Sequence, residues 1–262
     1  MKKAVLLTAV ALAACQQPSS NDDAANTATA NVAAATEIQG RPVWLHASDK
    51  LNVKGVYYQA DHPKAIVVLF HQAGSSKGEY ATIAPRLVEA GYSALAIDQR
   101  AGGGMYGTNE TVEQMPKDWK HSMEDAQADM EGAIQWAGRF GKPIILWGSS
   151  YSASLVIPLA NVYRDRVKAV LSFSPGEYFP DKQRIGRAAA DLQAPIFITS
   201  AADPDEEAKA RAIAARVPGH LATLYVPKAG VHGSSTLVAA KDPDGAAANW
   251  TAVMAFLDKL AL

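Results

Sequence analysis

From about Ile38 to the C-terminus, the sequence alternates between strand-like and helix-like segments, and this alternation constrains the fold more than any other feature. The run Ala65–Phe70 is apolar at every position, which is typical of a strand covered on both faces. Further strands are predicted at 43–45, 53–59, 93–97, 144–147, 167–173, 196–200 and 222–226, and helices at 82–90, 122–138, 151–163, 205–215 and 249–260. We expect the first two strands to form an antiparallel pair. Because helices separate most of the others, the pattern predicts a doubly wound, mostly parallel α/β sheet with helices on both faces.

The N-terminal segment has the organisation of a secretory signal. A basic start, Met1–Lys3, precedes the apolar run Ala4–Ala14, which is too short to span a bilayer because a spanning helix needs about 20 residues. The run ends at Cys15, the only cysteine in the chain, and the tetrapeptide Leu12-Ala13-Ala14-Cys15 resembles the lipobox of bacterial lipoproteins. The resemblance implies a signal peptide at 1–14 and fatty acyl groups such as palmitate on Cys15. The alternative is an ordinary signal peptide, with Cys15 incidental.

A lipid on Cys15 would anchor the protein to a membrane of the bacterial cell envelope. In a similar sorting rule of enterobacterial lipoproteins, an aspartate after the cysteine favours retention at the inner membrane. The chain has Gln16 at this place, which implies the outer membrane and a location facing the periplasm. Residues 15–37 are polar or small, so we expect a flexible tether, followed by one domain at 38–262. The 25 basic and 26 acidic residues include no dense basic stretch, so no nucleic-acid partner is expected.

A candidate nucleophile follows the predicted strand at 144–147. Gly148 and Ser152 flank Ser150 at two residues on either side, and a helix begins at once. A sharp strand-to-helix turn needs small residues at these positions, because the two backbones approach closely. Ser149 fails the same requirement, since its corresponding neighbours are tryptophan and tyrosine. The alternative is a serine-rich helix cap on an unrelated α/β fold.

Four segments follow one another along the chain in an order that resembles the α/β-hydrolase superfamily. They are the loop His71–Ser75, the stretch 98–104, the strand-to-helix turn at Ser150 (called the elbow from here on) and the loop Gly230–Gly233. The nearest resemblance is to bacterial serine hydrolases grouped with dienelactone hydrolases. It implies that His232 is the base and that Asp203, after the strand at 196–200, is the acid. Asp203 could instead be only a helix N-cap, with Glu177 as the reserve acid.

The resemblance also implies an oxyanion hole. One backbone N–H would come from Tyr151, and the other from Gln72 or Ala73, a choice the sequence leaves open. The glycines at 102–104 lack the spacing of a phosphate-binding loop, and Asp98 and Arg100 are expected to be structural.

The connection at 174–194 is short, which predicts a minimal cap and an open cleft suited to small esters. We therefore expect a serine esterase that acts on a small-molecule ester, with no cofactor and no metal. The same triad also serves thioesterases, peptidases and acyltransferases. A rival from another class is a non-catalytic envelope lipoprotein that uses the fold as a binding module.

Overall fold

The structure is a computed structural model, and it describes residues 38–262. The signal peptide predicted at 1–14, the tether predicted at 15–37 and the lipidation site at Cys15 lie outside these residues. Between residues 38 and 262, no helix is both long and apolar enough to cross a membrane.

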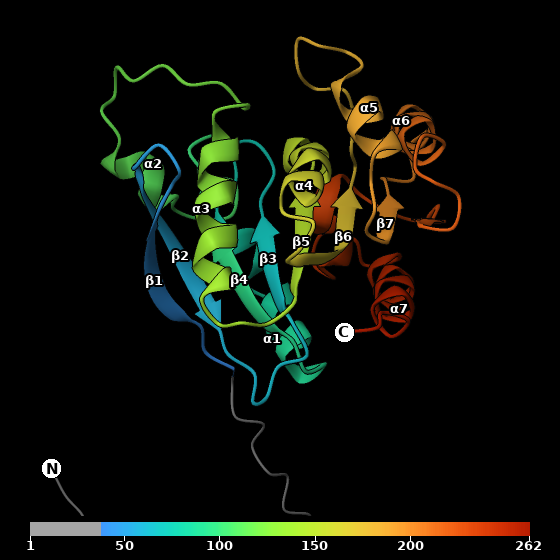
Figure 1. The fold of residues 1–262 in the computed structure, drawn as a ribbon, viewed down its shortest axis with the longest axis horizontal. Coiled ribbons are helices and arrows are strands. Elements are labelled where there is room, and N and C mark those ends of the chain that lie inside the picture. Colours follow the sequence, from blue (N-terminus) through green and yellow to red (C-terminus); the bar gives the residue numbers. More distant parts are fainter. Residues whose placement is uncertain (1–37) are drawn as a thin grey trace, which may run out of the picture. The chain divides into compact units, whose positions relative to one another are not determined.

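An eight-stranded sheet runs through the domain (Figure 1). Its strands are β1 Arg41–His46, β2 Asn52–Tyr58, β3 Ile66–Phe70, β4 Ser93–Ile97, β5 Ile144–Ser149, β6 Val167–Phe173, β7 Ile196–Thr199 and β8 Ala222–Leu224. The spatial order is β1-β2-β4-β3-β5-β6-β7-β8. Strand β2 pairs antiparallel with β1 and β4, and all other pairs are parallel. The predicted mostly parallel sheet is therefore confirmed.

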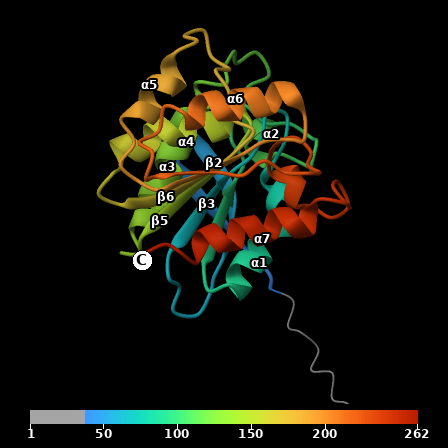
Figure 2. The same cartoon turned by 90° about the vertical axis from the view of Figure 1, so that its right-hand side faces the viewer.

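Helices cover both faces of the sheet, as Figures 1 and 2 show. They are α1 Ile83–Glu89, α2 Glu110–Gln114, α3 Ala126–Gly138, α4 Tyr151–Val162, α5 Arg184–Ala190, α6 Pro204–Ala214 and α7 Ala246–Leu257, with 3₁₀ turns η1 Lys77–Tyr80 and η2 Gly233–Leu237. Strand β3 shows why both faces must be covered. Ile66 and Val68 pack into a core with α3 to α6, whereas Val67 and Leu69 pack into a second core with α1 and α7.

Some boundaries differ from the predictions for local reasons. The helix expected at 122–138 begins at Ala126, because the Ser122 N–H and hydroxyl both donate to the Asp125 carboxylate and form a separate turn. Helices α2 and α5 were not predicted, since one or two helical turns carry too little hydrophobic periodicity to be recognised. The short α5 is the only helix in the connection at 174–194.

The chain reverses its direction of winding between β3 and β5. From β3 it passes to β4 on one side, and it then returns across the sheet to β5 on the other side. In open α/β sheets, the crevice at the carboxyl ends of the strands at such a switch point is the usual ligand site. One neighbouring loop there is held by Arg100, which forms ion pairs with buried Asp129 and with Asp49. The expected structural role of Arg100 is thus observed.

Candidate active site

The turn after β5 holds Ser150 in a strained conformation. Its φ of 60° and ψ of −123° lie where a residue with a side chain is rarely found, and such strain occurs mostly at functional sites. Gly148 allows the turn, because a Cβ atom there would collide with the backbone of Ser152 and Ala153. Ser152 is buried and donates its hydroxyl to the His71 carbonyl oxygen at 2.7 Å. The size requirement used to select Ser150 is therefore met in the structure.

His232 lies in the loop between β8 and η2 and contacts an acidic side chain. Its Nδ1 is 2.6 Å from Oε1 of Glu206, which belongs to the first turn of α6. Burial raises the pKa of the Glu206 carboxyl, but hydrogen bonds from His232, Ser174 and the Ala201 N–H outweigh burial and bring this pKa to about 2. Glu206 is therefore ionised at neutral pH and can hold the imidazole with a proton on Nδ1.

The expected pairing of Asp203 with His232 is not formed. Asp203 is the N-cap of α6, and its carboxylate accepts the N–H groups of Asp205 and Glu206 at 3.1 Å each. Glu206 occupies the third helical position, from which a side chain reaches back over the helix N-terminus, as in a capping box. The alternative reading of Asp203 as a cap is thus the one observed. The reserve acid, Glu177, is also engaged elsewhere, because it accepts the N–H groups of Ile185 and Gly186 in α5.

The histidine loop packs directly against the elbow. The Ser234 N–H donates to the Ser149 hydroxyl at 2.9 Å, and the Gly233 N–H donates to the Ser174 hydroxyl at 2.9 Å. Gly233 has a positive φ of 67°, and a Cβ atom there would collide with Ser149. Within residues 38–262, the hydrogen bonds that join the two loops run through these neighbours, with no direct bond between Ser150 and His232. Such catalytic contacts commonly tighten only when substrate is bound.

The loop after β3 distinguishes between the two candidate oxyanion donors. The Gln72 N–H donates to Glu79 Oε2 at 3.0 Å and is therefore occupied within the protein. Ala73, the next residue, is exposed. Tyr151 is the first residue of α4, where backbone N–H groups have no partner within the helix. Of the two candidates, Ala73 is therefore the one whose N–H remains for a substrate together with that of Tyr151.

Glu79 is a buried carboxylate that joins three segments of the site. Besides Gln72, it accepts the Ser149 hydroxyl at 2.7 Å, and the Gln72 side-chain amide bridges Glu79 and Ser235 at 3.3 and 3.1 Å. Burial raises the pKa of Glu79, and hydrogen bonds from Ser149 and Gln72 oppose the rise. Because these partners all act as donors, the geometry fits an ionised carboxylate.

Sequence reasoning missed Glu206, Glu79 and Ser174. The signal for Glu206 was present in Asp203-Pro204-Asp205-Glu206, which has the spacing of a capping box. Ser174 follows β6 with a positive φ of 57°, and it lies beside both Glu206 and the histidine loop. For Glu79 we find no sequence signal, because a single charged residue in a short turn is most often exposed.

Comparison with known families gives one match. A family model described as "Serine aminopeptidase, S33" matches residues 61–220, which include Ser150 and Glu206 but end before His232. No curated protein matches the chain.

Several solved structures have a similar fold. An esterase of Pyrococcus furiosus matches with a TM-score of 0.63 and 16% identity, covering 85% of this chain and 93% of that chain. A dienelactone hydrolase from Anabaena variabilis gives a TM-score of 0.62 and 16% identity, covering 83% of this chain and 95% of that chain. An acylaminoacyl peptidase of Pyrococcus horikoshii gives 0.62 and 13% identity, with coverage of 85% and 41% respectively. At these identities, the likeness concerns the fold alone.

Proposed function

Because the chain belongs to the serine aminopeptidase S33 family of α/β-hydrolases, we propose that it cleaves carboxylic esters of small molecules through an acyl-enzyme on Ser150. The observation that carries the proposal is the 2.6 Å contact between His232 Nδ1 and Glu206 Oε1, in a loop packed against the elbow of Ser150. A hydroxyl becomes a useful nucleophile only when a base accepts its proton and a third group orients that base.

In the proposed reaction, Ser150 Oγ attacks the ester carbonyl carbon while His232 Nε2 accepts the hydroxyl proton. The Glu206 carboxylate stabilises the imidazolium that forms. The N–H groups of Ala73 and Tyr151 donate to the oxyanion, and His232 then transfers its proton to the leaving alcohol. Water, activated by the same histidine, hydrolyses the acyl-enzyme and restores the Ser150 hydroxyl.

The choice of esters over amides rests on the access to Ser150. The connection at 174–194 contains only the short helix α5, so this connection builds no large cap; Ser150 itself is buried but keeps a small exposed fraction of 8%. An open site of this kind suits small or exposed esters. Thioesters, peptides and acyl transfer to a second alcohol use the same nucleophile and remain alternatives. A binding module without catalysis is the alternative from another class.

We expect a fluorophosphonate probe to label the wild-type protein at Ser150 and a p-nitrophenyl ester series to be hydrolysed. Ser150→Ala and His232→Ala should each abolish labelling, because the probe reacts only with an activated serine. Ser122→Ala, which removes an exposed serine outside the proposed triad, is the matched control and should label normally. Intact-mass spectrometry and peptide mapping give the site and stoichiometry.

The outcomes separate the alternatives. A folded wild-type protein that does not label would favour the binding module. Labelling at Ser149 or Ser152 would preserve the hydrolase but contradict the elbow assignment. Faster cleavage of aminoacyl p-nitroanilides than of p-nitrophenyl esters would favour the peptidase.

For the N-terminal segment, we propose that Cys15 carries the lipid and anchors the protein to the outer membrane, facing the periplasm. The support is the lipobox-like tetrapeptide at 12–15 and the absence of any other cysteine in the sequence. The polar residues from Gln16 to Thr36 would then separate the catalytic domain from the membrane surface.

Cys15→Ser is expected to move the protein from the membrane fraction to the soluble fraction of the host bacterium, because the thiol that would carry the lipid is gone. Metabolic labelling with palmitate should be lost in parallel. Ester hydrolysis per molecule should be unchanged. A membrane fraction that retains the Cys15→Ser protein would contradict the lipid anchor.

A further inference from the structure

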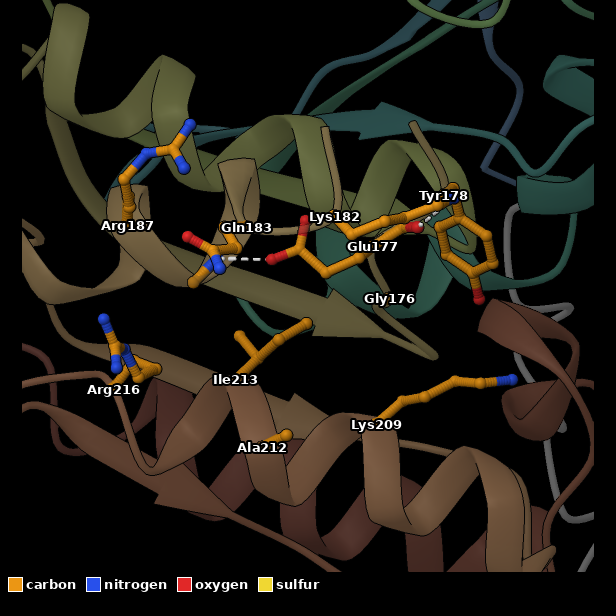
Figure 3. A pocket seen from close by; sticks show the side chains of 11 residues that line it. Gly176, Glu177, Tyr178, Lys182, Gln183, Arg187, Lys209, Ala212, Ile213 and Arg216 are labelled. Carbon is orange, nitrogen blue, oxygen red and sulfur yellow. Dashed lines mark hydrogen bonds between the residues drawn. The ribbon is translucent and has the colours of Figure 1, made fainter. Parts of the chain in front are cut away.

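A hollow of about 700 Å³ lies between α5, α6 and the connection that follows β6. Figure 3 shows Glu177, Gln183 and Arg187 on the α5 side, facing Lys209, Ile213 and Arg216 on the α6 side. The function proposed above makes no use of this hollow.

One end of the hollow adjoins the candidate active site. Tyr178 lines the hollow, and its hydroxyl donates to the Ser174 carbonyl oxygen at 2.8 Å. Burial raises the pKa of Tyr178, and Ser150 lies close enough that hydrogen bonding to it opposes the rise. Lys209 follows Glu206 by three residues on α6, so the two side chains share one side of the helix. In Figure 3, the Tyr178 hydroxyl and the Lys209 ammonium lie toward the same end of the hollow.

Positive charge dominates the lining. The four cationic side chains are Lys182, Arg187, Lys209 and Arg216. Arg187 pairs with Asp181, and the Lys182 ammonium donates to the Glu177 carbonyl oxygen. Among residues 38–262, no ion pair is formed by Lys209 or Arg216. The one carboxylate in the lining, that of Glu177, is already satisfied by two backbone N–H groups of α5.

Two unpaired cations beside a hollow attract an anionic group and repel a cationic one. An ester that places its carbonyl carbon at Ser150 can extend past Tyr178 into the hollow. A negative group on that extension meets Lys209 near Tyr178, with Arg216 at the far end of the hollow, whereas the ammonium group of an aminopeptidase substrate meets repulsion there.

We propose that the preferred substrates are esters whose acyl chain carries a negatively charged terminus, a carboxylate being the simplest, held by Lys209 at the Tyr178 end of the hollow. This inference rests on the ester hydrolysis proposed above and specifies its substrate class.

The test compares two esters of equal acyl length, p-nitrophenyl hexanoate and mono-p-nitrophenyl adipate, which differ in a terminal methyl or carboxylate. We expect the wild-type protein to have the higher kcat/KM for the adipate, and the preference to shrink with added salt because exposed charges are screened. Lys209→Gln should lower kcat/KM for the adipate by up to about fivefold, the upper size of one exposed ion pair, and leave the hexanoate nearly unchanged. Arg216→Gln, at the far end of the hollow, should have a smaller effect on the adipate.

Lys168→Gln is the matched control, since it removes an exposed lysine near the start of β6, at the end of the strand away from the carboxyl ends where Ser150 lies. It should alter neither ester. Equal kcat/KM for the two esters, or equal losses for both in Lys209→Gln, would overturn the anionic-substrate proposal while leaving ester hydrolysis intact.

Binding provides a readout that does not depend on turnover. In Ser150→Ala protein, calorimetry should find tighter binding of the adipate than of the hexanoate, and Lys209→Gln added to this variant should remove the difference. Failure of both fluorophosphonate labelling and ester cleavage would instead indicate that the proposed function is wrong. Equal binding of both esters to Ser150→Ala protein would overturn the anion site itself.

Discussion

Asp203 and Glu206 lie three positions apart in α6, and their carboxylates serve different partners. Asp203 is exposed and binds the helix N-terminus, whereas Glu206 is partly buried and binds His232. The difference follows from helix geometry, because an N-cap side chain folds over the first N–H groups while a side chain at the third position reaches back past them.

Glu206→Gln is expected to lower kcat by about 10⁴-fold, the loss known for removing the charge of a triad acid, because a neutral amide stabilises the imidazolium poorly and permits the wrong tautomer. Asp203→Asn is the matched control and should retain nearly full activity, since asparagine caps a helix as well as aspartate does. Steady-state kinetics with a p-nitrophenyl ester measure both. The reverse ranking of the two variants would restore Asp203 as the acid.

Three segments meet at Glu79: the loop after β3, the elbow after β5 and the turn η2 after His232. Its carboxylate binds the Gln72 N–H and the Ser149 hydroxyl, and Ser149 in turn accepts the Ser234 N–H. The first of these bonds fixes the His71–Gln72 peptide, one peptide before the one that carries the Ala73 N–H. We therefore infer that Glu79 is a positioning residue for the proposed oxyanion donor and for the histidine loop.

Glu79→Gln should lower kcat by about 10²-fold, comparable to the loss of one oxyanion donor, while KM changes little. The reason is that the new amide group presents hydrogen atoms to partners that are themselves donors. Glu113→Gln, an exposed substitution in α2, is the matched control. Urea unfolding should record a loss of about 1–3 kcal/mol in the free energy of unfolding for Glu79→Gln. A stability loss with unchanged kcat would reduce Glu79 to a structural role.

The stability of the whole domain should depend on pH through His71, which is fully buried. Its Nε2 accepts the Gln99 N–H at 2.9 Å, so its Nδ1 must carry the proton that faces the Gln72 carbonyl oxygen. Burial lowers the pKa of His71 from 6.5 to about 4, and the hydrogen bond to the Gln72 carbonyl opposes this only in part. Between about pH 4 and 6.5, His71 is therefore neutral in the folded state, whereas it is protonated in the unfolded chain.

We expect the free energy of unfolding to fall as the pH decreases from 6.5 towards 4, since only the unfolded state gains a proton on His71 in that range. A second decrease in the free energy of unfolding should follow between pH 4.5 and about 2, because Glu206 binds a proton at a higher pH in the unfolded state than in the folded state. Urea unfolding at each pH measures both. His71→Gln should flatten the first decrease, and His121→Gln, an exposed control, should not.

An NMR titration of the His71 ring in the wild-type protein provides the same test if His71→Gln does not fold. A ring that becomes protonated near pH 6.5 while the protein stays folded would contradict the prediction.

The sequence by itself predicted the alternation of strands and helices and the elbow at Ser150, because each depends on near neighbours along the chain, and the family resemblance added the loop of His232. Hydrophobic periodicity predicts strands and helices, and the sizes of Gly148 and Ser152 select Ser150. Only the tertiary structure showed that Glu206, and not Asp203, contacts His232, and that Glu79 occupies the Gln72 N–H. Both findings depend on which side chains meet across loops, as when the Gln72 amide reaches Ser235, and no local pattern specifies where a distant loop will pack.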